Sequence, residues 1–182
     1  MKTKRLWPVK ILSLFAFFSL LLLGTPGNFY ALSLVEIEPG FFTRSVSDIS
    51  FGGDEKKIFV LVNREREKKG LNRLIWNESL ARLARAFSEK MARDDFFDHI
   101  ESDGADVVKR AKALRIKKWE KIGENLFVCS GYDNYAAFAV QNWMKSKTHR
   151  QNILDKDFTA TGIGLAAGSD EKIYMTQVFI ED

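Results

Sequence analysis

The order in which helical and strand-like patterns follow one another limits the folds open to this chain. Apolar residues at three- and four-residue spacing predict amphipathic helices over residues 54–69, 78–93, 105–114 and about 134–146. The last thirty residues change period, and two β-rich runs separated by a turn predict an antiparallel hairpin over residues 161–180. Because the helices come first and no βαβ repeat occurs, this order predicts an α+β fold.

The strongest amphipathic signal covers residues 78–93. Asn77 is placed to cap this helix, and its predicted inward face consists of Leu80, Leu83, Ala84, Phe87 and Met91. In the hairpin, Gly162 and Gly164 permit close approach of another backbone. They do not form a phosphate-binding loop, since no helix with Lys and Ser or Thr follows them.

Residues 1–31 have the pattern of a targeting segment. Lys2, Lys4, Arg5 and Lys10 precede an apolar run over residues 11–23 that is shorter than the roughly 20 residues of a membrane span. This pattern predicts a secretory signal peptide. Phe29 is large for its position before a cut after Ala31, so an uncleaved N-terminal membrane anchor is the alternative. Residues 32–53 are predicted to be a linker, and residues 54–182 the folded domain.

The charge of the chain comes from this leader. The whole chain is formally +4, and without the four basic residues of the leader it has 24 basic and 24 acidic residues. A nucleic-acid-binding domain would carry an excess of positive charge itself, so the balance argues against one. Cys129 is the single cysteine, which excludes an internal disulfide framework.

One stretch of the domain is nevertheless basic. The cations are Lys109, Arg110, Lys112, Arg115, Lys117, Lys118 and Lys121. We interpret this stretch as a solvated helix face, the usual role of such a run. The alternative is a site for anionic surfaces such as wall polymers or lipid head groups.

The candidate functional residues are the two histidines and an acidic residue between them. His99 and His149 are fifty residues apart, and Glu124 lies between them in the segment Gly-Glu-Asn-Leu at 123–126. Two imidazoles and a carboxylate in one cavity could hold a divalent metal or move a proton. The alternative is that the histidines are ordinary packed or surface residues, or that the polar cluster braces the fold by hydrogen bonds.

Several short motifs occur in an order that resembles a known family. They are Phe97-Asp98-His99, the Gly-Glu-Asn-Leu segment, Asn142-Trp143 with residues 144–146, the segment 149–154, and Gly162-Ile163-Gly164. Together they resemble the bacterial branch of the CAP superfamily, the SCP-like domain shared with cysteine-rich secretory and plant pathogenesis-related proteins. The resemblance covers residues 54–182. It implies a three-layer α-β-α sandwich with a central antiparallel sheet and a large open cleft.

The resemblance also implies which residues line that cleft. Family members place two His and two acidic residues there, sometimes around a zinc ion. His99, Glu124 and His149 match three of these four positions, whereas Ser146 stands where animal members have the second acid. The missing acid weakens any function that needs two carboxylates, such as two-carboxylate glycoside hydrolysis.

We therefore expect an exported bacterial protein, extracellular or associated with the envelope, whose polar cleft binds a peptide, a wall polymer or a lipid. The binding residues would be His99, Glu124, Ser146 and His149, with His99 and His149 as ligands of a divalent metal such as Zn²⁺. The membrane would be contacted through the N-terminal segment if it is uncleaved, and no nucleic acid is expected.

The alternative function is a metal-assisted hydrolase acting on peptides or cell-wall material, with Glu124 as the catalytic general base. Attack by Ser146 with His149 as its base is a weaker variant, since no oxyanion hole or third orienting group can be identified. Lipid or sterol binding in an apolar groove, as in some eukaryotic family members, is neither supported nor excluded. Whether the protein is an enzyme is left open.

Overall fold

The computed structural model describes residues 51–169 and 171–182. Within these ranges the chain forms, in order, α1 (Gly52–Glu67), β1 (Ile75–Trp76), α2 (Glu78–Asp94), α3 (Val107–Ala113), β2 (Lys121–Cys129), α4 (Tyr135–Lys145), α5 (Lys147–Ile153), β3 (Ala160–Ala167) and β4 (Ile173–Glu181). The predicted leader and nearly all of the predicted linker lie outside the described residues. In the described part, no helix is long and apolar enough to cross a membrane.

The strands form one sheet in the order β1-β3-β4-β2. The predicted hairpin is confirmed, because β3 and β4 pair antiparallel from Ala160↔Ile180 to Ala167↔Ile173. Strand β2 pairs antiparallel with the other side of β4. The two-residue β1 was not predicted, and it pairs parallel with β3. The sheet is therefore antiparallel apart from this short edge.

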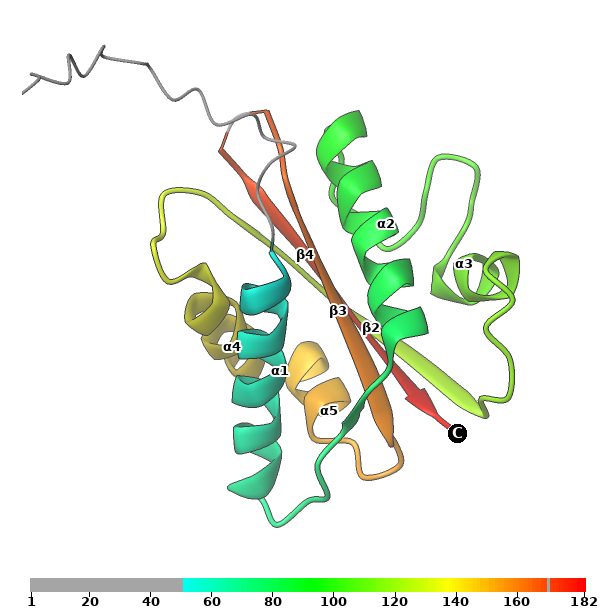
Figure 1. The fold of residues 1–182 in the computed structure, drawn as a ribbon, viewed down its shortest axis with the longest axis vertical. Coiled ribbons are helices and arrows are strands. Elements are labelled where there is room, and N and C mark those ends of the chain that lie inside the picture. Colours follow the sequence, from blue (N-terminus) through cyan, green and yellow to red (C-terminus); the bar gives the residue numbers. More distant parts are fainter. Residues whose placement is uncertain (1–50, 170) are drawn as a thin grey trace, which may run out of the picture. The chain divides into compact units, whose positions relative to one another are not determined.

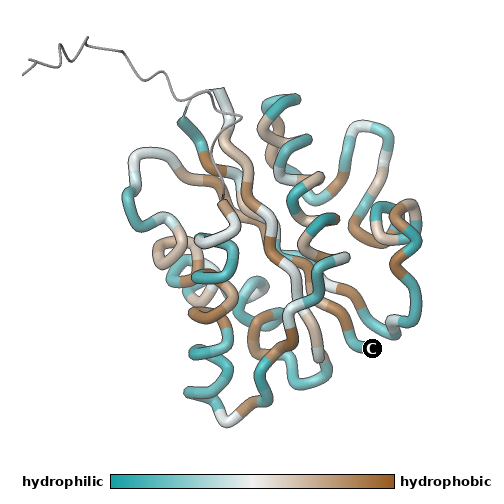
Figure 2. Tube along the Cα trace, viewed as in Figure 1, coloured by the Kyte–Doolittle hydropathy of each residue, from teal (hydrophilic) through white to brown (hydrophobic). Residues whose placement is uncertain are grey.

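Helices cover both faces of the sheet, which confirms the predicted α+β sandwich. Helices α2 and α3 lie on one face, and α1, α4 and α5 lie on the other (Figure 1). Hydrophobic residues gather along β3 and β4, whereas the helices alternate hydrophilic and hydrophobic positions (Figure 2). One cluster joins Trp143 to Ile163 and Phe179, and another joins Leu80 and Leu83 to Val178 and Ile180 on the opposite face.

The packing of α2 on β3 follows the sequence pattern closely. The five predicted apolar positions of α2 are all buried, and Asn77 Oδ1 accepts hydrogen bonds from the amides of Ser79 and Leu80 as a helix cap. A Cβ on Gly162 would lie 2.1 Å from the Ala81 amide nitrogen, and one on Gly164 would lie 2.0 Å from that of Arg85. The glycines therefore let the helix backbone rest directly on the strand.

Three local features complete the fold. Phe51 is at the N-cap position of α1, and Asp54 accepts a hydrogen bond from the Tyr135 hydroxyl. Strand β2 begins before Glu124, because its pairing with β4 extends back to Lys121↔Glu181. The helix α5, which begins after an extended Ser146, lies outside the predicted helices.

We predict that Gly164→Ala destabilises the domain by about 3 kcal/mol or more, because the new methyl group meets backbone atoms that cannot move aside. Unfolding in urea measures this change. The matched control is Gly53→Ala in α1, where a Cβ has nothing within 4 Å. That control should be neutral or stabilising by up to about 1 kcal/mol. Equal effects of the two substitutions would contradict the close contact.

Candidate functional site

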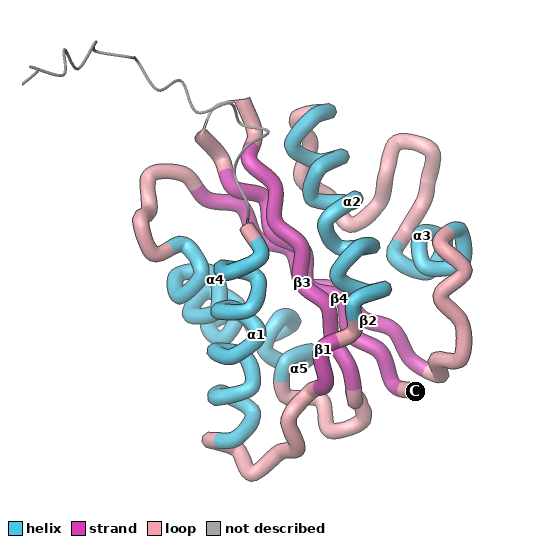
Figure 3. The backbone as a smooth tube through the Cα atoms, in the orientation of Figure 1, coloured by secondary structure: helices cyan, strands magenta, loops and turns pink. Residues whose placement is uncertain are grey.

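The candidate site is built on β2, which occupies one end of the described sheet. Glu124 pairs with Val178, whose side chain packs under α2, so the Glu124 side chain points to the α2–α3 face. Successive side chains of a strand point to opposite faces, so the neighbouring Asn125 points to the face covered by α5. His99 lies on the long connection between α2 and α3, and His149 lies in α5 (Figure 3).

Glu124 and Asn125, which are neighbours on β2, each contact a segment that carries a histidine. The Glu124 carboxylate lies 2.8 Å from His99 Nδ1. Asn125 Nδ2 donates to the backbone carbonyl of His149 at 3.1 Å, and Asn125 Oδ1 accepts from Asn152 Nδ2 at 2.9 Å. The Glu-Asn pair thus connects the α2–α3 loop to α5 through the two faces of one strand.

The Glu124 carboxylate is buried and doubly bound. Its side chain is 3% exposed, and its second oxygen accepts a hydrogen bond from Arg110 Nη2 at 2.7 Å. Arg110 is itself 10% exposed in its side chain. A buried carboxylate is costly unless a partner compensates its charge, and here the guanidinium does so.

Arg110 is the residue of this site that the sequence interpretation missed. It also donates to the backbone carbonyls of His99 and Ala105, and its guanidinium lies over the Phe87 ring. The basic stretch had suggested a solvated side chain. The helical period contained the correct signal, because position 110 lies three residues after Val107, which packs against the core.

The two histidines have opposite electrostatic environments. The hydrogen bond to Glu124 raises the pKa of His99 above its ordinary value. Burial, followed by the positive charge of His99, lowers the pKa of His149. At a pH close to the ordinary histidine pKa, these opposite shifts favour a charged His99 and a neutral His149.

The remaining candidates lie apart from this hydrogen-bonded cluster. Ser146 joins α4 to α5, and its hydroxyl lies 3.3 Å from Thr148 Oγ1. Among the described residues, no hydrogen bond connects the Ser146 hydroxyl to His149. Ser146 therefore has no base to activate it as a nucleophile. Cys129 is half-buried at the end of β2, and burial raises the pKa of its thiol, as expected for an unreactive cysteine.

The donor set for a metal is limited to imidazoles. In the described ranges, no group of three or more His, Cys, Asp or Glu side chains is arranged to hold a metal ion. Both oxygens of Glu124 are already engaged, so it is not a free ligand. His99 keeps Nε2 available while a carboxylate orients its Nδ1, the arrangement typical of a zinc-ligating histidine. Any metal held here would therefore depend on the imidazoles of His99 and His149.

Comparison with known protein families identifies the family of this chain. The model of the CAP family, described as the cysteine-rich secretory protein family, matches residues 59–179. The chain belongs to the CAP family. The resemblance stated from the sequence motifs is thereby confirmed.

Two Bacillus subtilis (strain 168) proteins are similar to this chain. "Uncharacterized protein YkwD" is 34% identical over 122 residues, which are 67% of this chain and 46% of the relative. "Uncharacterized membrane protein YlbC" is 32% identical over 127 residues, which are 70% of this chain and 34% of the relative. The match therefore spans less than half the length of each curated relative.

Solved structures agree in fold. An extracellular protein containing an SCP domain from Bacillus anthracis str. Ames superposes with a TM-score of 0.60 at 29% identity, covering 71% of this chain and 41% of that one. An outer surface protein from Borrelia burgdorferi superposes with a TM-score of 0.62 at 18% identity, covering 73% of this chain and 96% of that one. The second similarity supports the fold alone.

We predict that Glu124→Gln lowers the pKa of His99 toward its ordinary value of about 6.5, because the amide removes the negative partner of the imidazolium. Two-dimensional NMR of the ring protons as a function of pH measures both histidines separately. The Ser146→Ala variant is the control and should leave the His99 titration unchanged. An unaltered His99 pKa in Glu124→Gln would contradict the assigned hydrogen bond.

Arg110→Met should destabilise the domain by about 3–5 kcal/mol, because it leaves the buried Glu124 carboxylate without its cation. The double variant Arg110→Met with Glu124→Gln should recover part of this loss, since the buried negative charge is gone. Denaturant unfolding of the singles and the double gives the coupling energy. The exposed Lys112→Met on the same helix is the control, expected within about 0.5 kcal/mol of wild type. Strictly additive effects would argue against a buried ion pair.

Proposed function

We propose that this CAP-domain protein is exported and binds a ligand at the cluster formed by His99, Glu124 and His149. Export is supported by the signal-like pattern of residues 1–31 and by the descriptions of its relatives. One similar structure is described as extracellular, another as an outer surface protein, and one curated relative as a membrane protein.

The observation that carries the proposal is the double engagement of Glu124. With one oxygen on His99 and the other on Arg110, the carboxylate fixes the orientation of the His99 ring. The His99 side chain remains 53% exposed, so its free Nε2 edge is accessible to a ligand. His149, whose backbone carbonyl is bound by the neighbouring Asn125, would supply a second imidazole. The cluster would thus offer one ring nitrogen from each histidine.

The same observation favours binding over hydrolysis. A general base needs a carboxylate oxygen within hydrogen-bonding reach of the water that it activates. Glu124 has both oxygens committed and its side chain is nearly inaccessible. Its geometry suits an orienting role. Ser146 is also without a hydrogen bond to His149 in the described part of the chain, so the cluster is better suited to recognition than to catalysis.

A divalent metal fits this site as a shared partner of protein and ligand. His99 Nε2 and a ring nitrogen of His149 would hold it, and Glu124 would keep His99 in the required tautomer. When bound, zinc would offer coordination positions to a carboxylate or carbonyl group of the ligand. Two imidazoles alone make a weak site, so occupancy would rise when the ligand is present.

Titration calorimetry of the domain with zinc tests the metal part of the proposal. We expect measurable binding by the wild type and none by the His99→Ala/His149→Ala variant. Glu124→Gln should weaken binding about tenfold or more, because an outer carboxylate of this kind typically contributes that much. Ser146→Ala serves as the matched control and should bind as wild type does. Identical heats for wild type and the double histidine variant would reject a metal at these residues.

A further inference from the structure

The structure divides the basic stretch of residues 109–121 into two groups. Three of its seven cations bind neighbouring oxygen atoms, and they are Lys109, Arg110 and Lys121. The other four are exposed, and among the residues that the structure describes their side chains form no hydrogen bond or ion pair. They are Lys112, Arg115, Lys117 and Lys118. The last three lie in one short loop after α3 and can bind an anion from outside the domain.

Two core contacts fix this loop. Ile116 and Trp119 pack against the hydrophobic cluster that joins α2 to β4. The indole Nε1 of Trp119 also donates a hydrogen bond to the Ile116 carbonyl at 3.2 Å. The loop therefore holds Arg115, Lys117 and Lys118 on an anchored backbone, so less conformational entropy is lost when they bind a ligand.

The backbone of the loop is strained at two of its cations. Arg115 has a φ of 56° and Lys118 has a φ of 64°, both in the left-handed region that favours glycine. Arg115 directly follows the C-cap of α3, where helices most often have glycine, and the next amide, that of Ile116, donates to the Ala111 carbonyl. Each cation thus occupies a position where glycine would be less strained, and retained strain of this kind is typical of functional positions.

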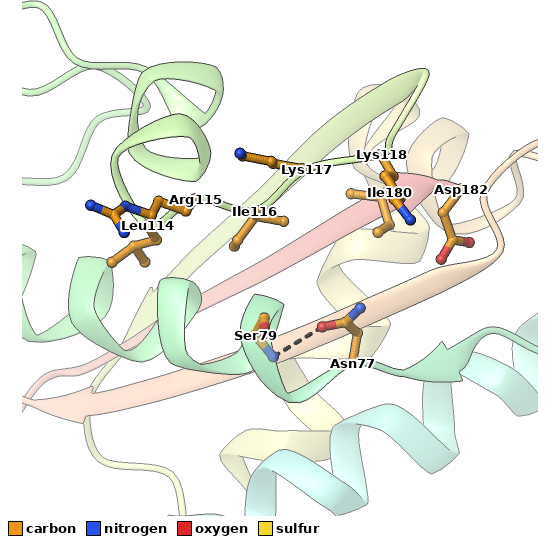
Figure 4. Close-up of a pocket in the computed structure, with 9 residues that line it drawn as sticks. All are labelled: Asn77, Ser79, Leu114, Arg115, Ile116, Lys117, Lys118, Ile180 and Asp182. Atoms are coloured by element: carbon orange, nitrogen blue, oxygen red, sulfur yellow. Dashed lines mark hydrogen bonds between the residues drawn. The ribbon is translucent and has the colours of Figure 1, made fainter.

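The three loop cations line one hollow but do not converge on one point. The hollow has a volume of about 480 Å³ and lies between the loop and the start of α2 (Figure 4). Figure 4 shows the Arg115 guanidinium and the Lys118 amine at opposite ends of the loop, with Lys117 between them. A small anion could contact one of these groups at a time. A linear polymer with a negative charge on each repeat could contact several of them at once.

The surroundings of the loop add little negative charge. Residues 107–118 contain six basic residues and no acidic one, although the chain without its leader has balanced charge. Asp182 is the acidic residue that lines the hollow, and its carboxylate accepts a hydrogen bond from the Thr159 hydroxyl. This local positive excess attracts a polyanion more strongly than a single anion, because each further contact releases counterions from the polymer.

We propose that the loop of residues 115–118 binds a linear phosphodiester polymer of the bacterial envelope. The Arg115 guanidinium and the two lysine amines form charge-assisted hydrogen bonds with phosphate oxygens, and successive phosphates meet successive cations. The affinity comes from several separate contacts rather than from one pocket. The proposal rests on the proposed export, because an exported protein meets such polymers. It is independent of the histidine cluster and of the metal.

The test measures the affinity of the full-length chain, in a non-ionic detergent, for lipid-free poly(glycerol phosphate) labelled at one end. Fluorescence anisotropy at several salt concentrations gives this affinity. Arg115→Gly/Lys118→Gly should weaken binding about tenfold or more and make it less dependent on salt, since two phosphate contacts are lost. The same variant should melt about 2 °C or more above wild type, because glycine relieves the left-handed strain. A loop with a purely structural role would not lose binding as it gains stability.

Two further variants separate charge from backbone strain. Arg115→Gln/Lys118→Gln removes the same charges and keeps the strained backbone, so it should weaken binding equally without a comparable gain in melting temperature. Arg64→Gln/Lys69→Gln is the matched control, because it removes one exposed arginine and one exposed lysine at a distant surface. This control should bind within twofold of wild type. The cations of the leader are common to all variants, so the differences report on the loop.

Several outcomes would overturn the proposal. Unchanged affinity in Arg115→Gly/Lys118→Gly would remove the role of the loop, and equal weakening in the control would leave net charge as the cause. Equal affinity for polyglutamate, or for vesicles of anionic lipid, would remove the preference for a phosphodiester polymer. His99→Ala/His149→Ala should bind the polymer as wild type does, even if zinc binding is absent from every variant. Loss of polymer binding in that variant would place the polymer at the histidine cluster instead.

Discussion

The site depends on the alternation of side chains along β2. Two consecutive residues, Glu124 and Asn125, point to opposite faces and hold different parts of the chain. A shift of one residue in the pairing with β4 would exchange their directions and separate both histidine segments from the strand. Gly123 is part of the same constraint, because a Cβ there would lie 2.8 Å from the Phe158 ring.

Side chains from helices, rather than another strand, bind backbone carbonyl groups of β2. The Leu126 carbonyl accepts a hydrogen bond from Trp143 Nε1 at 2.9 Å, and the Glu124 carbonyl accepts one from Asn152 Nδ2 at 3.2 Å. Side chains of α4 and α5 therefore satisfy groups that an edge strand would otherwise leave open to pairing with another chain. Behind them, the buried Arg66 donates to the carbonyls of Ile153, Asp155 and Phe158, which fixes the end of α5.

The sequence predicted those features that depend on local pattern. The buried face of α2, its Asn77 cap, the hairpin and the close approach at Gly162 and Gly164 all follow from periodicity and residue size. The ordered motifs led to the family, and the structure places Glu124 of one motif in hydrogen-bonding contact with His99 of another.

What the sequence did not predict depends on contacts between distant segments. Arg110 could not be distinguished from its basic neighbours, because its burial comes from Glu124 and Phe87 on other elements. The predicted helix over residues 105–114 included Leu114, but α3 ends at Ala113 and the Leu114 side chain is exposed.

The contact between α2 and β3 has a consequence for how the molecule can respond to a ligand. Where helix backbone touches strand backbone, no layer of side chains can change rotamer to absorb a displacement, so α2 can neither slide nor roll on the sheet. The seven-residue α3 has Ala111 as its buried residue and is held mainly through the Arg110 side chain. Residue size therefore makes α2 the more rigid helix on this face, and we expect any movement driven by a ligand in α3 and the loops that flank it.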